Sequence, residues 1–133
     1  MPPKIHSIDH LVLTVASIPA SVAFYSDVLG MKAEVFEAAD GSKRWALYFG
    51  QQKINLHQHK AEFDPKSSLP TPGSADICLL SNDSLEEWQA HFEKMEVSIL
   101  QGPVARSGAL GPIMSIYVRD PDGNLIEVSV SKD

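Results

Sequence analysis

The chain has 133 residues, a length that suits one globular domain with a sizeable core. Hydrophobic residues make up 44% and charged residues 21%, which excludes disordered, collagen-like and disulfide-based chains. The formal charge is −6 and the largest basic cluster is the pair Lys43-Arg44, so we expect no nucleic-acid partner. The negative net charge does not exclude small anionic substrates, because one arginine placed in a pocket can outweigh a diffuse surface charge.

Targeting signals are absent from the sequence pattern. No apolar run approaches the roughly 18 residues of a membrane span, and the first residues lack the apolar stretch of a signal peptide. The single cysteine, Cys78, cannot form an internal disulfide and is expected to be a small buried hydrophobe. We therefore expect a cytoplasmic protein without a membrane partner.

The first half of the sequence predicts a strand, a helix and three more strands. Residues 8–15 are apolar and partly β-branched, and residues 18–29 repeat apolar side chains at helical spacing. Pro19 suits the first turn of this helix and Gly30 its end. Residues 32–37, 44–49 and 53–57 then read as strands separated by turns.

A proline-rich linker at residues 61–74 separates this pattern from a second copy. The copy begins with a strand at 75–80 and a helix from the N-cap residues 81–84 to about Met95. A short strand at 97–100, a loop at 101–112, and strands at 114–119 and 125–130 complete it. The turn at 120–123, Asp-Pro-Asp-Gly, precedes the last strand.

The two halves are repeats of one βαβββ unit. An offset of 66 residues sets His10 against Asp76 and also aligns the two helix starts. Each module, at about 5–60 and 75–130, cannot cover both faces of its own sheet. We therefore expect one α+β domain, residues 1–133, whose modules pair within one chain or between two.

Side-chain alternation divides the last strand of each module into two faces. One set of apolar side chains is predicted to face the helices: Ile54, Leu56, Ile126 and Val128. The opposite set is polar and faces away from them: Asn55, His57, Glu127 and Ser129.

Three motifs carry a family resemblance: I-D-H-L-V-L-T-V, F-Y-S-D-V-L-G-M and D-P-D-G-N-L-I-E-V. Over residues 5–130 the sequence resembles the vicinal oxygen chelate superfamily of glyoxalases, bleomycin-resistance proteins and extradiol dioxygenases. K-I-N-L-H, P-T-P-G-S-A-D-I-C and G-P-I-M-S-I-Y further resemble the glyoxalase domain-containing protein 5 subgroup. The resemblance implies two modules that form a cupped, mostly antiparallel sheet around a central pocket.

The resemblance also implies a metal-ligand set from the first and last strands of each module. Carried over by position, the set is His10, Asn55, Asp76 and Glu127. His10 and Glu127 match the ligand types of the family, whereas Asp76 stands where histidine is common and Asn55 where some members have glutamate. His57 is the alternative to Asn55, although the repeat aligns it with Ser129.

An imidazole and carboxylates suit a divalent ion such as Zn, Ni, Mn or Fe. Such an ion would chelate two neighbouring oxygens of a small-molecule substrate and stabilise an oxyanion, with Glu127 as the base. The competing interpretation is that His10 and Glu127 only hydrogen-bond in a cup that binds no metal.

Substrate contacts are predicted for Asn55, Arg106 and Tyr117. Arg106 lies in the predicted glycine-flanked loop and could bind a carboxylate through two parallel hydrogen bonds, or could simply be solvated. Tyr117 shares a strand face with Ser115, and both could supply hydroxyl groups.

Three functions stay open. The first is a metal-dependent lyase or isomerase, and glutathione-linked ketoaldehydes are substrates of its best-known relatives. The second is an extradiol-type dioxygenase, which needs His57 as a second histidine. The third is a metal-free protein that sequesters a ligand. In each case we expect a homodimer, because the long linker permits exchange of modules between chains.

Overall fold

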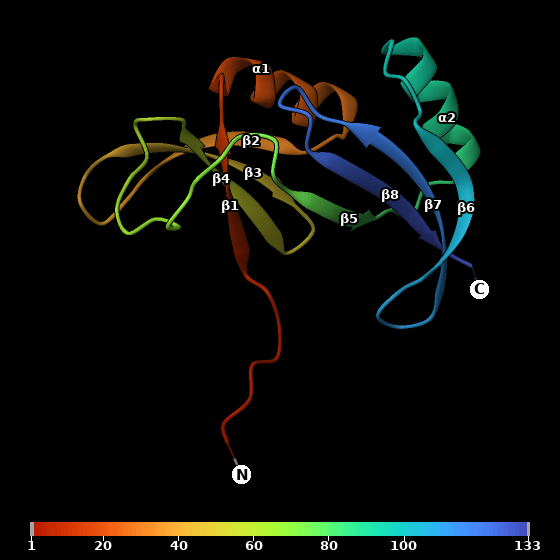
Figure 1. Ribbon diagram of the computed structural model, residues 1–133, viewed down its shortest axis with the longest axis horizontal. Helices are drawn as coiled ribbons and strands as arrows, with labels where there is room; N and C mark the ends of the chain where they lie inside the picture. Colours follow the sequence, from red (N-terminus) through yellow and green to blue (C-terminus); the bar gives the residue numbers. More distant parts are fainter. Residues whose placement is uncertain (1, 133) are drawn as a thin grey trace. The chain divides into compact units, whose positions relative to one another are not determined.

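The computed structural model describes residues 2–132, which divide into two compact units with the boundary between Thr71 and Pro72 (Figure 1). The boundary lies inside the linker predicted at residues 61–74, which contains turns and bends but no helix or strand. Each unit contains one four-stranded sheet.

The first unit follows the predicted order of strand, helix and three strands. Its elements are β1 (His10–Val15), α1 (Ile18–Ala23), a π-helical turn η1 (Phe24–Val28), β2 (Lys32–Glu37), β3 (Lys43–Phe49) and β4 (Gln52–Gln58). The sheet order is β1-β4-β3-β2, in which β1 runs parallel to β4 and the other two pairings are antiparallel.

Local chemistry determines where the first helical segment begins and ends. Ser17 accepts a hydrogen bond from the amide of Ala20 at 3.2 Å, and a proline occupies the first turn. Gly30, with φ of +72°, ends the segment in the left-handed conformation that glycine adopts without steric cost. The predicted helix over 18–29 is therefore present as α1 followed by η1.

The second unit repeats this arrangement. Its elements are β5 (Asp76–Leu80), α2 (Leu85–Lys94), β6 (Gln101–Ser107), β7 (Pro112–Arg119) and β8 (Leu125–Ser131), in the sheet order β5-β8-β7-β6. Ser84 caps α2 by accepting a hydrogen bond from the amide of Glu87 at 3.1 Å. Again one pairing, β5 with β8, is parallel.

Strand register confirms the internal repeat and the α+β class. His10 pairs with Lys53 at the start of the β1–β4 ladder, and Asp76 pairs with Leu125 at the start of the β5–β8 ladder. Asn55 and Glu127 therefore occupy equivalent positions, two residues further along β4 and β8.

The alternation predicted for the last strands is confirmed on the core side. The four apolar side chains are at most 2% exposed: Ile54, Leu56, Ile126 and Val128. Helix α1 contacts β4 and helix α2 contacts β7, so each unit has a helix packed on its own sheet (Figure 1). The opposite face of each sheet presents the polar residues of interest.

The prediction of a strand at residues 97–100 was wrong, because these residues form no strand. The strand is β6 at Gln101–Ser107, inside the region predicted as a loop. The Gly102-Pro103 pair favoured a loop over a strand in the sequence. In the structure the β6–β7 ladder includes this pair through a register shift between Gln101 and Val104. Gly102 has φ of +111° and lies against the backbone of β7, where a Cβ would overlap the carbonyl oxygen of Ser115.

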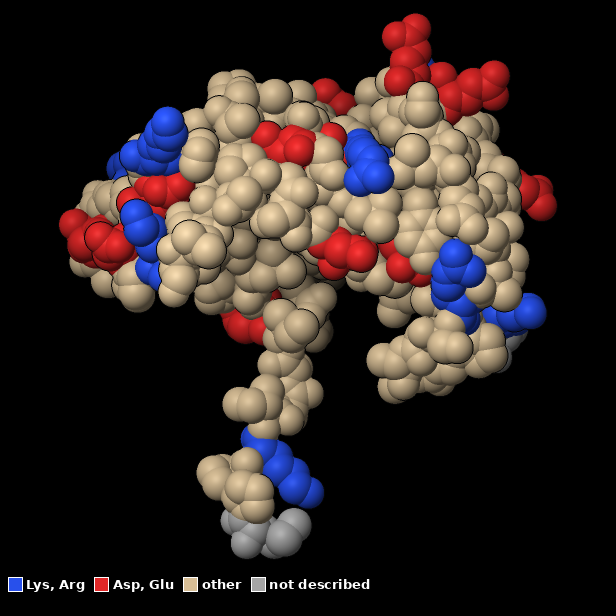
Figure 2. Space-filling model, viewed as in Figure 1, with Lys and Arg blue, Asp and Glu red and all other residues tan. Residues whose placement is uncertain are grey.

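The surface charges are dispersed over the described residues. On the face drawn in Figure 2, basic groups lie as small separate clusters among acidic and uncharged atoms. Within residues 2–132, none of the helices has the length and apolar character needed to cross a membrane.

Candidate functional site

The β1–β4 register places Asn55, rather than His57, near His10. Asn55 pairs with Val12 and His57 pairs with Thr14, so these side chains lie two and four residue steps from the level of His10. At about 3.3 Å per step, the separations along the strand are about 7 Å and about 13 Å. Strand β4 therefore brings Asn55, but not His57, to the His10 end of this face.

His10 is exposed and its imidazole is oriented by a neighbouring carboxylate. Its Nδ1 lies 2.8 Å from Oδ1 of Asp9, and because a carboxylate can only accept, Nδ1–H is the donor. This tautomer leaves the lone pair of Nε2 free. A metal-binding histidine commonly has this arrangement, in which a carboxylate accepts the hydrogen bond of the other ring nitrogen.

Asn55 carries a buried oxygen atom that lacks a protein partner. Its Oδ1 is inaccessible to solvent and accepts no hydrogen bond from the residues that the structure describes. A buried amide oxygen without a donor is unfavourable by roughly 1–3 kcal/mol, so such atoms usually face a ligand or an ion. Asn55 is therefore the stronger of the two β4 candidates in the first unit.

In the second unit, the turn before β8 positions Glu127. The Asp120 carboxylate accepts hydrogen bonds from the amides of Asp122 and Asn124, each at 2.9 Å. Asn124, only 2% exposed, donates to Asp120 at 2.7 Å and accepts from the amide of Ala75 at 2.8 Å. These bonds hold the starts of β5 and β8 together, which explains why the D-P-D-G-N motif precedes the candidate glutamate.

Glu127 is half-buried and its two oxygens have different surroundings. Oε2 accepts hydrogen bonds from the hydroxyls of Ser115 at 2.6 Å and Ser129 at 3.4 Å. Oε1 accepts no hydrogen bond from an N–H or O–H group of the described residues, and the Cys78 thiol interacts with the same carboxylate. Asp76 is exposed on the same sheet face, two register steps from Glu127. One carboxylate oxygen of Glu127 is thus available to a ligand.

Cys78 was predicted to be buried, and this was wrong: the residue is exposed. It pairs with Glu127 across the β5–β8 ladder, and its Sγ lies 3.3 Å from the hydroxyl of Ser129. Burial of the sulfur raises the pKa of the Cys78 thiol, and the Glu127 carboxylate adds to the effect. The thiol therefore stays protonated near neutral pH and is a poor nucleophile.

Arg106 lies in strand β6, not in the loop where it was predicted. Its Nε donates to the hydroxyl of Tyr117 at 2.9 Å, and its guanidinium carbon lies 5.4 Å from the centre of the tyrosine ring. Tyr117 in turn pairs with Glu127 across the β7–β8 ladder. The second unit therefore places the predicted substrate-binding pair, Arg106 and Tyr117, on the strands beside the candidate base.

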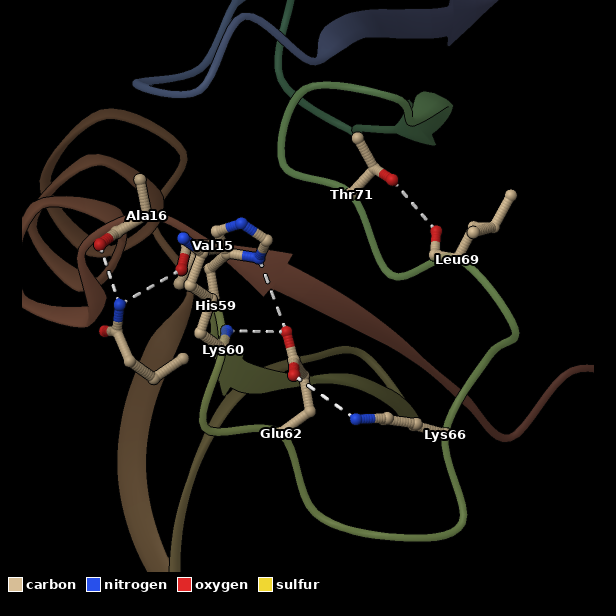
Figure 3. Close-up of polar contacts among 9 residues, drawn as sticks. Val15, Ala16, His59, Lys60, Glu62, Lys66, Leu69 and Thr71 are labelled. Carbon is tan, nitrogen blue, oxygen red and sulfur yellow. Dashed lines mark hydrogen bonds and ion pairs between the residues drawn. The ribbon is translucent and has the colours of Figure 1, made fainter.

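A linker cluster at Glu62, Phe63 and Lys66 was not recognised in the sequence. The Glu62 side chain, 5% exposed, accepts from the amide of Lys60 at 2.8 Å and lies 3.4 Å from Nδ1 of His59 and 3.6 Å from Nζ of Lys66 (Figure 3). The Lys60 amide holds the pKa of the Glu62 carboxyl below its usual value. Hydrophobic and charge patterns in the sequence could not reveal this cluster, because its contacts depend on the irregular backbone of the linker.

Phe63 anchors the same segment to the polar face of the sheet. The guanidinium of Arg44 stacks on its ring at 4.0 Å, and the ring meets His57 edge-on at 5.6 Å between centroids. His57 is consequently buried, and burial lowers its pKa, with a further lowering from the positive charges of Arg44 and Lys66. His57 is therefore a neutral imidazole near pH 7.

The candidate donor atoms, each described within its own unit, are of the types that a borderline or hard divalent ion prefers: an imidazole nitrogen, an amide oxygen and carboxylate oxygens. The unsatisfied Oδ1 of Asn55 is the clearest sign of fit. Across residues 2–132, no three His, Cys, Asp or Glu side chains gather into a group that could hold a metal ion.

Comparison with known proteins identifies close relatives along nearly the whole chain. The virulence protein STM3117 of Salmonella typhimurium is 53% identical over 125 residues, which cover 94% of this chain and 84% of that protein. Its crystal structure matches with a TM-score of 0.90 and 52% identity, covering 96% of this chain and 98% of the other. The glyoxalase domain-containing protein RDO1 of Mycosarcoma maydis is 48% identical over 130 residues, covering 98% and 71% of the two chains.

Two more distant relatives have names that describe an activity. The metallothiol transferase FosB of Staphylococcus epidermidis is 28% identical over 124 residues, which cover 93% of this chain and 83% of that protein. The lactoylglutathione lyase of Agrobacterium tumefaciens is 26% identical, with a TM-score of 0.68 and coverage of 98% and 96%. A family model also matches residues 7–128. The chain therefore belongs to the Glyoxalase/Bleomycin resistance protein/Dioxygenase superfamily.

Proposed function

We propose that this chain is a divalent-metal-dependent lyase or isomerase of the glyoxalase type, acting on a small molecule with two neighbouring oxygen atoms. The proposed ligands are His10 and Asn55 of the first unit and Asp76 and Glu127 of the second. The observation that carries the proposal is the buried, unpartnered Oδ1 of Asn55 on the same sheet face as His10. A cation bound beside this side chain would give the oxygen the partner that it lacks.

Each protein group has a defined part in the proposed reaction. The bound Zn, Ni, Mn or Fe ion supplies Lewis acidity, which lowers the energy of a substrate oxyanion. Glu127 would act as the base that takes a proton from the substrate carbon, with its Oε2 held by a hydrogen bond from Ser115. Arg106, oriented by Tyr117, binds a substrate carboxylate through its remaining N–H groups.

The names of the two distant relatives support this reaction class. One is a lyase of lactoylglutathione, and the other is a transferase whose name joins a metal with a thiol. A thiol-linked small molecule is therefore the first substrate class to test. Extradiol cleavage is less favoured, since it requires two histidines, and His57 lies about 13 Å from the level of His10 along the sheet.

The proposal extends to assembly and location: a cytoplasmic homodimer whose partner is a small-molecule substrate. The relatives described above support the small-molecule partner through their names. The mildly acidic composition of the chain, with a formal charge of −6, suits such a partner better than nucleic acid.

The direct test is an activity assay on protein stripped with a chelator and reloaded separately with Zn, Ni, Mn or Fe(II). A glutathione-linked ketoaldehyde and a catechol are offered as substrates. We expect metal-dependent conversion of the first substrate, lost in Glu127→Gln. Ring cleavage of the catechol with Fe(II) alone would instead establish a dioxygenase, and ligand binding without metal or turnover would establish a sequestering protein.

A further inference from the structure

The linker of the first unit covers part of the β1–β4 pair and forms a pocket of about 250 Å³. The strands contribute Val12, Thr14 and His57 to its lining, and the linker contributes Pro65, Lys66, Ser67 and Pro70. The pocket belongs to the first unit alone. Its histidine lies four register steps from His10, whereas Val12 pairs with Asn55, so the pocket adjoins the Asn55 end of the proposed ligand set on the same sheet face.

His57 is the group that gives the pocket chemical character. Its side chain is only 6% exposed and borders the pocket, yet its ring nitrogens form no hydrogen bond with the described residues. Its one recorded ring contact is the edge-on contact with Phe63. Neither ring nitrogen is fully shielded from solvent, so each can contact a ligand that enters the pocket.

Charged side chains surround His57, and one cation lines the pocket. The cations Arg44 of β3 and Lys66 of the linker lie near His57, as does the carboxylate of Glu62. Lys66 Nζ lies 3.6 Å from Glu62, beyond hydrogen-bond distance, so its N–H groups can still donate to a ligand. Arg44 is already paired with Asp40 at 3.0 Å, which leaves Lys66 as the cation that lines the pocket.

The remaining walls combine hydroxyl groups with apolar surface. Thr14 and Ser67 carry hydroxyls that can donate to an oxyanion, whereas Val12, Pro65 and Pro70 offer only hydrocarbon. Val12 is 45% exposed, which is unusual for a valine in a strand and leaves apolar surface for a ligand to cover. At roughly 30 Å³ per water, the volume equals about eight water molecules, enough for a short-chain acid.

We propose that this pocket binds a small aliphatic carboxylate. The carboxylate accepts hydrogen bonds from Lys66, Ser67 and His57, and the hydrocarbon tail packs against the valine and the two prolines. Glu62 is a positioning residue, because its contacts with the linker hold Lys66 in place (Figure 3). The pocket gives the protein a carboxylate-recognition site that operates without a metal.

The test is nuclear magnetic resonance of the histidine rings in the full, chelator-stripped chain, titrated with acetate, propionate and butyrate. We expect saturable shifts of the His57 resonances and a dissociation constant that falls about fourfold with each added methylene. Lys66→Gln should weaken butyrate binding about two- to fivefold, the loss expected for a partly exposed charge partner. Lys94→Gln, a change at an exposed lysine of α2, is the control and should leave binding unchanged.

Three results would overturn the proposal: no saturable shift with butyrate, equal binding of butylamine, or tighter binding of inorganic phosphate than of butyrate. Unchanged butyrate affinity in Lys66→Gln would overturn it as well. Because all samples are free of metal, failure here is distinguishable from failure of the proposed lyase or isomerase activity, which is measured with metal.

Discussion

The two oxygens of Glu127 differ in their protein contacts, and this difference makes a conservative substitution informative. In Glu127→Gln the amide oxygen can still accept from Ser115, so the fold should persist while the negative charge is lost. We expect metal affinity to fall by tenfold or more, at least the loss seen when a group that only orients a metal ligand is changed. Isothermal titration with Zn and Mn measures it, and Glu86→Gln on the surface of α2 is the control. Wild-type affinity in Glu127→Gln would remove Glu127 from the ligand set.

Asp9 offers a second test, because it acts on the metal only through His10. Asp9→Asn weakens the hydrogen bond that orients the imidazole, and we expect metal affinity to fall by about 10- to 100-fold. Asp83→Asn, at another exposed aspartate, should have no effect. If the two variants bind metal equally well, the orientation of His10 by Asp9 has no functional role.

His57 should make folding stability depend on pH. Its pKa is lowered in the folded state, mainly by burial, from the usual value of 6.5, so below pH 6.5 the unfolded chain binds more protons than the folded one. The contribution is therefore complete above pH 6.5 and is lost as the pH falls through the lower, folded-state pKa. Urea unfolding between pH 5 and 8 should show this loss, and His57→Gln should reduce it. An unchanged pH profile in the variant would show that other groups cause it.

At the residue scale, alternation in β4 and β8 correctly separated core from polar side chains, because the period of two holds along any regular strand. The choice between Asn55 and His57 could not be made from the sequence. Both lie on the same face, and only the register with β1 shows which one is near His10.

Strand β6 shows how a single element can be missed. Gly-Pro normally interrupts a ladder, so residues 101–112 read as a loop, whereas the chain uses the pair in an irregular ladder against β7. Helices α1 and α2 were predictable because their caps and apolar spacing are local features. The linker cluster at Glu62 was not predictable, since no periodic pattern specifies it.

The role of Gly102 in this element is testable by a matched pair of substitutions. Gly102→Ala combines a positive φ with overlap against the Ser115 carbonyl, and we expect it to destabilise the fold by about 2–4 kcal/mol. Gly41→Ala has a similar positive φ but open space around it, so only about 1 kcal/mol is expected. Chemical denaturation compares them. Equal losses would show that the contact with β7 is unimportant.

For the whole molecule, the repeat predicted its division into two similar units, since each unit repeats the same order of elements and the same register. We propose that the chain forms a homodimer, as the long linker permits exchange of modules. Multi-angle light scattering should give twice the mass of 14.5 kDa at micromolar concentration. A stable mass of one chain would contradict the dimer.

The central proposal is that a divalent ion binds the folded protein, with His10 and Glu127 among its ligands. Ligands dispersed along the unfolded chain bind poorly, so an ion at about 100 times its dissociation constant should add roughly 2.7 kcal/mol of stability. The corresponding increase in melting temperature is on the order of 5 to 12 °C. The decisive measurement is a thermal melt of chelator-stripped protein with Mn, Fe(II), Co, Ni or Zn, repeated with His10→Ala and Glu127→Gln. We predict that at least one ion raises the wild-type midpoint by several degrees and that both variants lose the shift. If no ion moves the wild-type midpoint by more than about a degree, or if both variants keep the full shift, the account is contradicted.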